Sequence, residues 1–559
     1  MRVSRAVSRE LAVLIRWIEL TRRRSVDRRK AQAYSAAVAD AEFRAAMADY
    51  DSFVDVAGAV VEPAFPIGTA KDSAGDAIPI RLALDSLAAH WLVQGSTGVG
   101  KTTFAGSLMA WSLGQQAPIG TIDCKSGFFQ SAIRSAGAIA YELSPDDREV
   151  FIRRLAVVNP FGETLPPFNV CAPLPGTSAE VQAYDLTLAL SRLFEAALSV
   201  HMENILRHLV ILLVASNLTL VEAPLVLQDE IIRGILVERA GNPVLKDFFF
   251  RTYRSLPRTS TDALLSRLSA LLLPERMRLM LGADTIVDLG GIICRGDPLI
   301  AFFGKGNDIA EEQVNVLAGL FLQVFLQAAY ASEGRHRPYL VILDEFFHLL
   351  DAPALADRFA TALATLRSFG LHRALIMHNF AQVPPALREA ILTHCDYVAT
   401  FRSSIRNCEV LGDFLPENDP SIVADALDRQ GELPNRQELQ RRIRERLQRL
   451  PNRQCYWYDR RQPYRALLVG VPDVPEPHEP LGISAHALDE FISKHGIDTG
   501  GVALSRETLR QQIAAREERL RQLINPPVRI ATVTPAPQQP VTTATPAVSP
   551  VRKRRPQLG

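Results

Sequence analysis

The segment from His90 to Thr103, HWLVQGSTGVGKTT, decides the fold class of this chain of 559 residues. From Gly95 onward it fits the pattern GxxxxGK[ST], in which glycines let backbone N–H groups turn inward around phosphate oxygens. The apolar run before Gly95 is typical of a strand, and the residues from Thr103 to Leu113 are compatible with a helix. A strand, a glycine-rich loop and a helix in this order predict a nucleotide-binding loop.

The predicted role of each loop side chain follows from the charge of a nucleotide. Lys101 would neutralise the β- and γ-phosphates, and Thr102 would offer its hydroxyl to Mg²⁺. Only 8 of the 62 basic residues are Lys, so a Lys here is more informative than in a Lys-rich chain. The alternative is a glycine-rich turn with an exposed Lys. The residues predicted to surround ATP are Gly95, Ser96, Thr97, Gly98, Val99, Gly100, Lys101, Thr102 and Thr103.

Such a loop needs a carboxylate to hold Mg²⁺, and the segment LVILDE from Leu340 to Glu345 supplies two. Asp344 ends an apolar, β-branched run, so we expect it at a strand end near the metal. Glu345 follows directly, where a general base for water would project. The doublet favours ATP hydrolysis over a GTPase switch; the alternative is a buried strand that ends at a solvated acidic turn. Because Lys101 and Asp344 lie 243 residues apart, a large insertion must separate them.

Short apolar runs alternate with helical stretches before about residue 176 and again after about residue 285, which predicts a mostly parallel sheet. The segment from about 176 to 285 shows only long, helix-periodic stretches. The predicted strands are Trp91–Gly95, Ile119–Asp123, Ala138–Leu143, Leu155–Asn159, Leu299–Gly304, Tyr339–Asp344, Ala374–Met377, Tyr397–Arg402 and Tyr464–Val469. The predicted helices of the insertion are Glu180–Leu198, Met202–Ser216, Val226–Glu238 and Ser260–Leu272, and Ser505–Ile524 is a further helix.

These patterns predict an α/β fold, with a P-loop NTPase core of mostly parallel sheet that an all-helical insertion domain splits in sequence. The predicted regions are a basic N-terminal helical region at 1–55, the first part of the core at 56–175, the insertion at 176–285, the second part of the core at 286–475, a C-terminal helical extension at 476–525 and a disordered, Pro-rich basic tail at 526–559.

Charge and cysteine content narrow the class further. The formal net charge is +1, so charge alone does not indicate a nucleic-acid partner. The distribution is uneven, because residues 1–30 carry +7 and residues 526–559 carry +5. No two of the six cysteines form a CxxC pair, which argues against a disulfide framework or zinc ribbon and favours a reducing compartment. No apolar run approaches the roughly 20 residues of a membrane span, so we expect no transmembrane segment.

Several segments in order resemble the TraG/TraD type of conjugative coupling protein, within the HerA–FtsK superfamily of ring-forming ATPases that pump DNA. The resemblance covers about residues 56–475. Its motifs are the phosphate loop with its flanks, His90–Thr103; the turn Ile122–Gly127; Asn159–Phe161 with Pro167–Asn169; the acidic strand end Asp344–Phe346; Arg367–Leu371 with Met377–Asn379 and Ala381–Val383; and Phe401–Arg402.

The resemblance implies that the P-loop NTPase core is RecA-like. It also implies a homo-hexameric ring that threads single- or double-stranded DNA without regard to sequence, with ATP and Mg²⁺ at subunit interfaces. At positions that match the family motifs, Arg367 becomes the candidate arginine finger that reaches a neighbour's γ-phosphate. Arg402 is a weaker candidate for that role, and a surface ion pair is the other interpretation of Arg367. Asp123 and Lys125 match the acidic and basic positions of the family's D-P-K-G turn.

The chain departs from the family pattern in three places. His378 stands where the family has a Gln, and it either senses the γ-phosphate or is a core His with its hydrogen bonds satisfied. Cys124 replaces the Pro of the D-P-K-G turn, and we expect it to pack, since no activating base is evident. The family's two N-terminal membrane helices are not apparent. The short basic helix at Arg9–Arg24 would lie on an anionic membrane, contact nucleic acid or be simply solvated.

These features favour a DNA-translocating ATPase of a conjugation, type IV secretion or mobile-element system, with a relaxase or secretion channel as partner. A motor that recruits protein substrates for secretion and a HerA-like repair motor that works with a nuclease are alternatives with the same fold. A nucleotide-gated scaffold that rarely hydrolyses ATP is a further alternative. We expect a cytoplasmic protein, peripheral at the inner membrane if the N-terminal helix binds there.

Overall fold

The structure is a computed structural model that describes residues 44, 63–72, 74–125, 127–193, 198–306, 308–331, 337–345, 353–380, 383–412, 436–461 and 466–524. The predicted basic helix at Arg9–Arg24 and the predicted Pro-rich tail lie outside the described residues. Phe346, Ala381 and Gln382 of the family motifs also lie outside them.

The described strands form one sheet of eleven, in the order β2-β1-β11-β10-β9-β3-β8-β7-β4-β6-β5. The strands from β9 to β5 in this order pair in parallel, and the pairings from β2 to β9 are antiparallel. The prediction of a mostly parallel sheet is therefore confirmed. The strands are β1 (Ala64–Lys71), β2 (Ala77–Ala83), β3 (Trp91–Gln94), β4 (Ile119–Asp123), β5 (Ala156–Val158), β6 (Leu299–Phe302), β7 (Tyr339–Asp344), β8 (Leu371–Met377), β9 (Tyr397–Phe401), β10 (Gln454–Asp459) and β11 (Ala466–Gly470).

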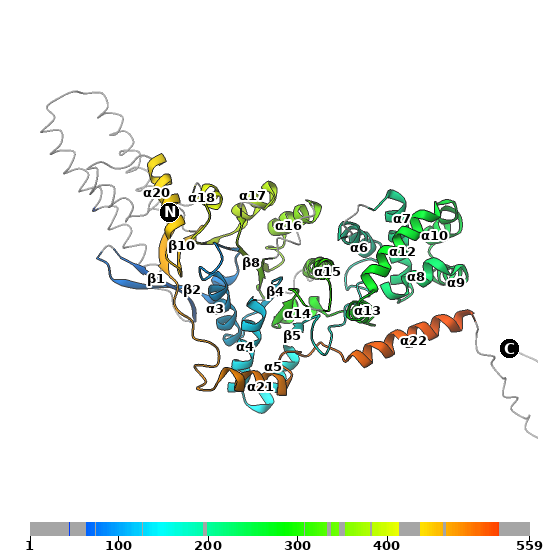
Figure 1. Ribbon diagram of the computed structural model, residues 1–559, viewed down its shortest axis with the longest axis horizontal. Helices are drawn as coiled ribbons and strands as arrows, with labels where there is room; N and C mark the ends of the chain where they lie inside the picture. The colour runs from blue at the N-terminus through cyan, green and yellow to red at the C-terminus, as the bar shows by residue number, and fades with distance from the viewer. Residues whose placement is uncertain are drawn as a thin grey trace, which may run out of the picture.

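Helices cover the parallel strands on both faces (Figure 1). In β3, Leu92 belongs to one apolar core, whereas Trp91 and Val93 belong to the other. Strands buried on both faces are continuous apolar runs, which explains why the sequence reveals them. The helices of the core of Trp91 are α3 (Lys101–Gly114), α4 (Gly127–Glu142), α5 (Pro145–Arg154) and α21 (Ala485–His495). The helices of the core of Leu92 include α15 (Glu311–Ala331), α16 (Pro353–Thr365) and α17 (Pro385–His394).

Between β5 and β6 the described chain forms helices and connecting loops, at one end of the sheet (Figure 1). The helices continue to Arg295, beyond residue 285, the predicted end of the insertion. They are α6 (Ala179–Leu193), α7 (Val200–Ala215), α8 (Ala223–Gln228), α9 (Glu230–Ala240), α10 (Pro243–Asp247), α11 (Tyr253–Ser255), α12 (Arg258–Leu272), α13 (Glu275–Leu281) and α14 (Leu289–Arg295).

Two predicted elements differ from the structure. The predicted strand Ala138–Leu143 is the end of α4, because Ala132, Ala136 and Ala140 recur every fourth residue and bury one helical face. Small apolar residues at this spacing fit a helix as well as a strand. The predicted helix Val226–Glu238 is two helices, since Asp229 ends α8 and its side chain accepts hydrogen bonds from the first backbone N–H groups of α9.

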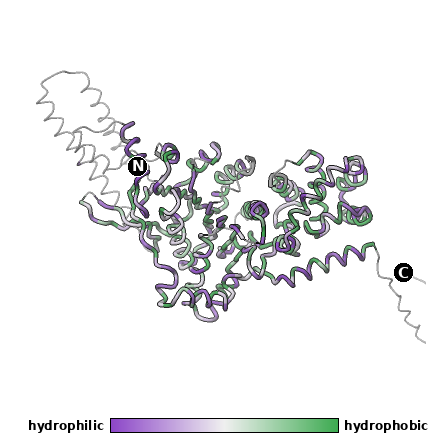
Figure 2. Tube along the Cα trace, in the orientation of Figure 1, coloured by the Kyte–Doolittle hydropathy of each residue, from purple (hydrophilic) through white to green (hydrophobic). Residues whose placement is uncertain are grey.

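The C-terminal helices α21 and α22 (Arg506–Ile524) contact the sheet-containing core and the helical part between β5 and β6, respectively. Helix α21 packs on α4, where Arg134 forms an ion pair with Asp489 at 2.8 Å. Helix α22 packs on α9 and α13 of the helical part. There Arg516 is buried and forms an ion pair at 3.2 Å with Glu222, which is also buried. Hydrophilic and hydrophobic residues alternate along α22, as expected for a helix with one buried face (Figure 2).

One helix among the described residues, α15, is long and apolar enough to cross a membrane by length and composition alone. However, 72% of its apolar window is buried inside the protein. It packs on α6 and α14, and Phe321 and Phe325 are fully buried. These contacts are those of a core helix.

Candidate functional site

The predicted phosphate loop connects β3 to α3 at the carboxyl end of the parallel strands. Gly98 and Gly100 have backbone φ values of 75° and 111°, which residues other than glycine rarely adopt. The N–H of Ser96 donates to the carbonyl oxygen of Arg402 at 2.7 Å, and the N–H of Gly95 donates to that of Met377 at 3.2 Å. The loop is therefore held against the ends of β8 and β9.

A cavity of about 490 Å³ lies over this loop. It brings together residues that are far apart in sequence, because the carboxyl ends of parallel strands meet at one edge of a sheet. Its lining residues are Thr97, Gly98, Gly100, Lys101, Thr102, Thr103, Lys125, Gly127, Asp344, Glu345, His378, Asn452 and Arg453.

A chain of four polar side chains crosses the cavity. Lys101 Nζ lies 2.7 Å from His378 Nδ1 and donates to the carbonyl oxygen of Ser96 at 2.7 Å. The other ring nitrogen of His378, Nε2, contacts Glu345 Oε1. Lys125 Nζ lies 3.0 Å and 2.9 Å from the two oxygens of the same carboxylate. The structure thus brings Lys101, His378, Glu345 and Lys125 into one network.

The protonation states in this network follow from burial and charge. Burial and the nearby Lys101 and Lys125 lower the pKa of His378 to about 4, so the imidazole is neutral at pH 7. A neutral ring accepts at one nitrogen and donates at the other. His378 Nδ1 therefore accepts from the Lys101 ammonium and Nε2–H donates to Glu345. Burial lowers the pKa of Lys101 itself to about 8, against the raising effect of Asp344, which leaves it mostly protonated at pH 7.

The donor set of the cavity fits a magnesium ion. Burial, and then the neighbouring Asp123 carboxylate, raise the pKa of Asp344 to about 7. The nearby Lys101 and Lys125 lower the Asp344 pKa but do not offset burial, and a divalent cation would add further positive charge beside the carboxylate. Asp344 and Thr102 offer the oxygen atoms that Mg²⁺ prefers, and Mg²⁺ commonly uses one or two carboxylates plus phosphate and water oxygens. Among the described residues, no group of three or more His, Cys, Asp or Glu forms a separate metal site.

Asp123 and Cys124 lie beside the cavity and support the local structure there. The carboxylate of Asp123 is fully buried and accepts from the backbone N–H groups of Lys125, Phe128 and Phe129 at 2.7–3.0 Å. It thereby caps α4 and fixes the turn that presents Lys125. Burial is the main cause that raises the pKa of the Cys124 thiol, and the nearby carboxylates of Asp123 and Asp344 raise it further. A thiol that stays protonated is a poor nucleophile, in agreement with the packing role expected for Cys124.

Glu345 has an unusual backbone conformation, with φ at 52°. Non-glycine residues in this region are uncommon, and such strain is concentrated at functional sites. The N–H of Glu345 donates to the carbonyl oxygen of Ile376 at 3.2 Å, which holds the turn after β7 against β8. The turn directs the side chain toward Lys125 and His378.

The two candidate finger arginines lie at opposite edges of the sheet. Arg402 directly follows β9, and its carbonyl oxygen is the acceptor of the phosphate loop. Arg367 precedes β8 and forms an ion pair at 3.0 Å with Asp396, just before β9. This pair lies at the amino end of the strands, roughly 15 Å from the loop by the rise of a strand. The structure does not bring Arg367 to the cavity of its own chain, and its predicted action across an interface stays a prediction.

Three residues that line the cavity, Asn452, Arg453 and Gly127, are not among the predicted site residues. Gly127 begins α4, directly after the turn of Lys125. Asn452 and Arg453 belong to the turn before β10, which lies on the antiparallel side of the sheet. The N–H of Arg453 donates to the carbonyl oxygen of Val99 at 2.8 Å, so this turn is attached to the phosphate loop.

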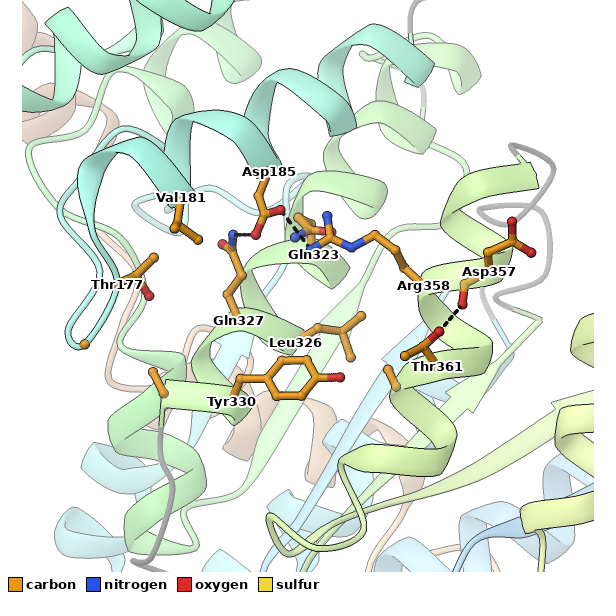
Figure 3. Close-up of a pocket in the computed structure, with 13 residues that line it drawn as sticks. Thr177, Val181, Asp185, Gln323, Leu326, Gln327, Tyr330, Asp357, Arg358 and Thr361 are labelled. Carbon is orange, nitrogen blue, oxygen red and sulfur yellow. Dashed lines mark hydrogen bonds and ion pairs between the residues drawn. The ribbon is translucent and has the colours of Figure 1, made fainter.

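A second cavity, of about 540 Å³, lies away from the phosphate loop, among α6, α15 and α16 (Figure 3). Asp185 of α6 forms an ion pair at 2.9 Å with Arg358 of α16 and accepts from Gln327 Nε2 at 2.6 Å. These contacts join the helical part to the core. Because its lining lacks a phosphate loop, we assign the nucleotide to the first cavity.

The sheet and the first cavity define the chain as a protein with a P-loop nucleotide-binding core. No protein-family model matches the sequence, and no curated protein matches it.

Solved structures that are similar to this chain include one of VirB4 and several of the plasmid coupling protein TrwB. VirB4 of Thermoanaerobacter pseudethanolicus has a TM-score of 0.49 and 10% identity, over 74% of this chain and 98% of that chain. The plasmid coupling protein TrwB in complex with ADP and Mg²⁺ has a TM-score of 0.46 and 14% identity, over 75% of this chain and 97% of that chain. TrwB with a non-hydrolysable GTP analogue has a TM-score of 0.45 and 15% identity, over 70% and 87%.

Proposed function

We propose that this chain is a Mg²⁺-dependent ATPase that drives the translocation of DNA through a ring of identical subunits. One observation carries the ATPase part. Lys101, Asp344 and Glu345 line the same cavity, although more than 240 residues separate the first from the other two. A basic residue for phosphates, a carboxylate for the metal and a second carboxylate for water are the groups that phosphoryl transfer requires.

The side chains would divide the chemistry as follows. Lys101 and the backbone N–H groups of the loop would bind the β- and γ-phosphates. A Mg²⁺ ion held by Thr102 and Asp344 would neutralise charge that develops on the phosphates. Glu345 would accept the proton of the attacking water. A carboxylate has about four acceptor sites, so Glu345 can bind water and keep its contacts with Lys125 and His378.

The ring, the DNA substrate and the partners rest on the family resemblance. The role proposed for Arg367 requires its side chain to be accessible to a neighbouring subunit, and 49% of that side chain is exposed. A relaxase, a secretion channel or a nuclease would then determine which DNA or protein the motor handles. We place the motor in the cytoplasm, where a reducing environment suits the free cysteines found among the described residues.

The rate of ATP hydrolysis with and without DNA tests this proposal. We expect hydrolysis that requires Mg²⁺ and rises when single- or double-stranded DNA is added, in a salt-dependent manner, because phosphate contacts release counterions. A matched measurement with a neutral polymer controls for crowding. Hydrolysis that ignores DNA at every salt concentration would count against the motor, and no hydrolysis at all would refute the enzyme.

A further inference from the structure

We propose that Arg453 is a nucleotide-binding residue whose guanidinium exchanges an internal partner, Asp473, for the phosphates of the bound nucleotide. This inference rests on the proposed ATP site. It concerns the turn before β10, and it adds to that site a cation from the antiparallel side of the sheet.

The backbone places Arg453 beside the phosphate loop. Its N–H donates to Val99 at 2.8 Å, and its carbonyl oxygen accepts from the N–H of Val471 at 2.8 Å. Its side chain passes so close to Gly100 that a Cβ there would lie 3.3 Å from Arg453 Cγ. The turn is therefore attached to the loop on one side and to the end of β11 on the other.

The conformation of Arg453 is itself unusual. Its φ is 62°, and only four described residues other than glycine have a positive φ. Two of these four, Glu345 and Arg453, line the nucleotide cavity. Because such conformations are retained where the surrounding structure requires them, the pair marks both as parts of the site.

The present partner of Arg453 is easily displaced. Arg453 Nη1 forms an ion pair with Asp473, whose side chain is 78% exposed. Exposed ion pairs contribute little to stability, because water and salt screen the two charges. A phosphate gives an Arg a charge-assisted, bidentate contact that is stronger than such a pair. Nucleotide in the cavity would therefore compete well for the guanidinium.

The position of Arg453 also indicates which phosphates it contacts. Lys125, Glu345 and His378 form the part of the cavity where water attacks the γ-phosphate. Arg453 contacts Val99 and Gly100, the residues just before the helix N-terminus of α3. We therefore assign it to the phosphates that ATP and ADP share, so that its loss weakens both ligands alike.

Equilibrium binding of ADP and ATP, both with Mg²⁺, tests the inference with three variants. Arg453→Gly removes the guanidinium and keeps a residue that tolerates positive φ, and Arg453→Lys keeps the charge without the planar fork. Asp473→Asn removes the internal partner. We expect Kd for ADP to rise about 10- to 100-fold in Arg453→Gly, the worth of one charged hydrogen bond. It should rise less in Arg453→Lys and fall or stay equal in Asp473→Asn.

Three results would overturn the inference. Unchanged ADP affinity in a folded Arg453→Gly variant would show that the guanidinium does not touch nucleotide. An equal loss in Arg453→Gly and Asp473→Asn would show that the ion pair only supports the turn. A wild-type protein that binds neither nucleotide would refute the proposed function itself, and the first two results remain distinct from it because they require normal wild-type binding.

Discussion

The replacement of His378 gives a direct test of the network that crosses the cavity. The neutral imidazole accepts from Lys101, at 2.7 Å, and donates to Glu345. A Gln side chain can do both, because its carbonyl oxygen accepts and its NH₂ group donates. We therefore expect His378→Gln to keep the network and His378→Ala to break it.

The size of the effect follows from the bonds that are lost. In His378→Ala the Lys101 ammonium loses an acceptor and the Glu345 carboxylate loses a donor. A hydrogen bond to a charged group is worth about 1.5–3 kcal/mol. If one such bond is lost in the transition state, kcat should fall by about 10- to 100-fold. In His378→Gln we expect kcat within about threefold of the wild type.

Phosphate release at saturating ATP and Mg²⁺ measures these rates. Because the pKa of His378 is lowered to about 4, the imidazole keeps its proton count between pH 6 and pH 8. The ratio of wild-type to His378→Gln rates should therefore be constant over that range. A wild-type rate in His378→Ala would refute the network, and a His378→Gln rate as low as that of His378→Ala would refute the exchange of roles between the two side chains.

Three further predictions concern stability and assembly. Burial lowers the pKa of His90 to about 2 and that of His372 to about 4 in the folded protein. Below about pH 6.5 the unfolded chain therefore binds more protons than the folded protein, and the free energy of unfolding decreases as the pH is lowered. Each His should lower the free energy of unfolding by about 2 kcal/mol at pH 5 relative to pH 7, as measured by urea unfolding. Equal stability at both pH values would contradict this prediction. Arg516→Leu removes the cation beside the buried Glu222 carboxylate, which then keeps only its hydrogen bonds from Thr219. We therefore expect the free energy of unfolding to fall by about 3–5 kcal/mol, whereas a urea midpoint equal to the wild type would show that α22 is not held there. In mixtures of Arg367→Ala and wild-type subunits, activity should fall by more than the mutant fraction, and a proportional fall would exclude action across an interface.

The parts of the site that the sequence predicts are those with a local signal. The phosphate loop follows an apolar strand, and Asp344 and Glu345 end another. Parallel topology then brings the two strand ends to one edge of the sheet without further information. The prediction that His378 and Lys125 belong to the same site depends on the family resemblance, and the structure places both within contact of Glu345.

Other features have no local signal. Arg453 reaches the cavity through the pairing of β10 with β9, and its segment carries no pattern that connects it with the loop. Arg367 is bonded to Asp396 because β8 and β9 flank β3, an order that no stretch of sequence reveals.

The predicted strands do not include β1, β2 or β10, although they include β11, which also belongs to the antiparallel part. Pro66 and Gly68 interrupt the apolar run of β1, and Pro79 interrupts that of β2. Alanine-rich Ala138–Leu143 fits both strand and helix, and packing on α21 decides for helix.

The central claim is that Lys101 binds the phosphates and Glu345 acts on water in the same cavity. Binding and hydrolysis of ATP, measured side by side in Lys101→Ala and Glu345→Gln, test it most directly. We predict that Lys101→Ala loses ATP binding, whereas Glu345→Gln binds ATP as well as the wild type but hydrolyses it at least 100-fold more slowly, on the order of the loss expected for a general base. Full hydrolysis by Lys101→Ala would contradict the claim.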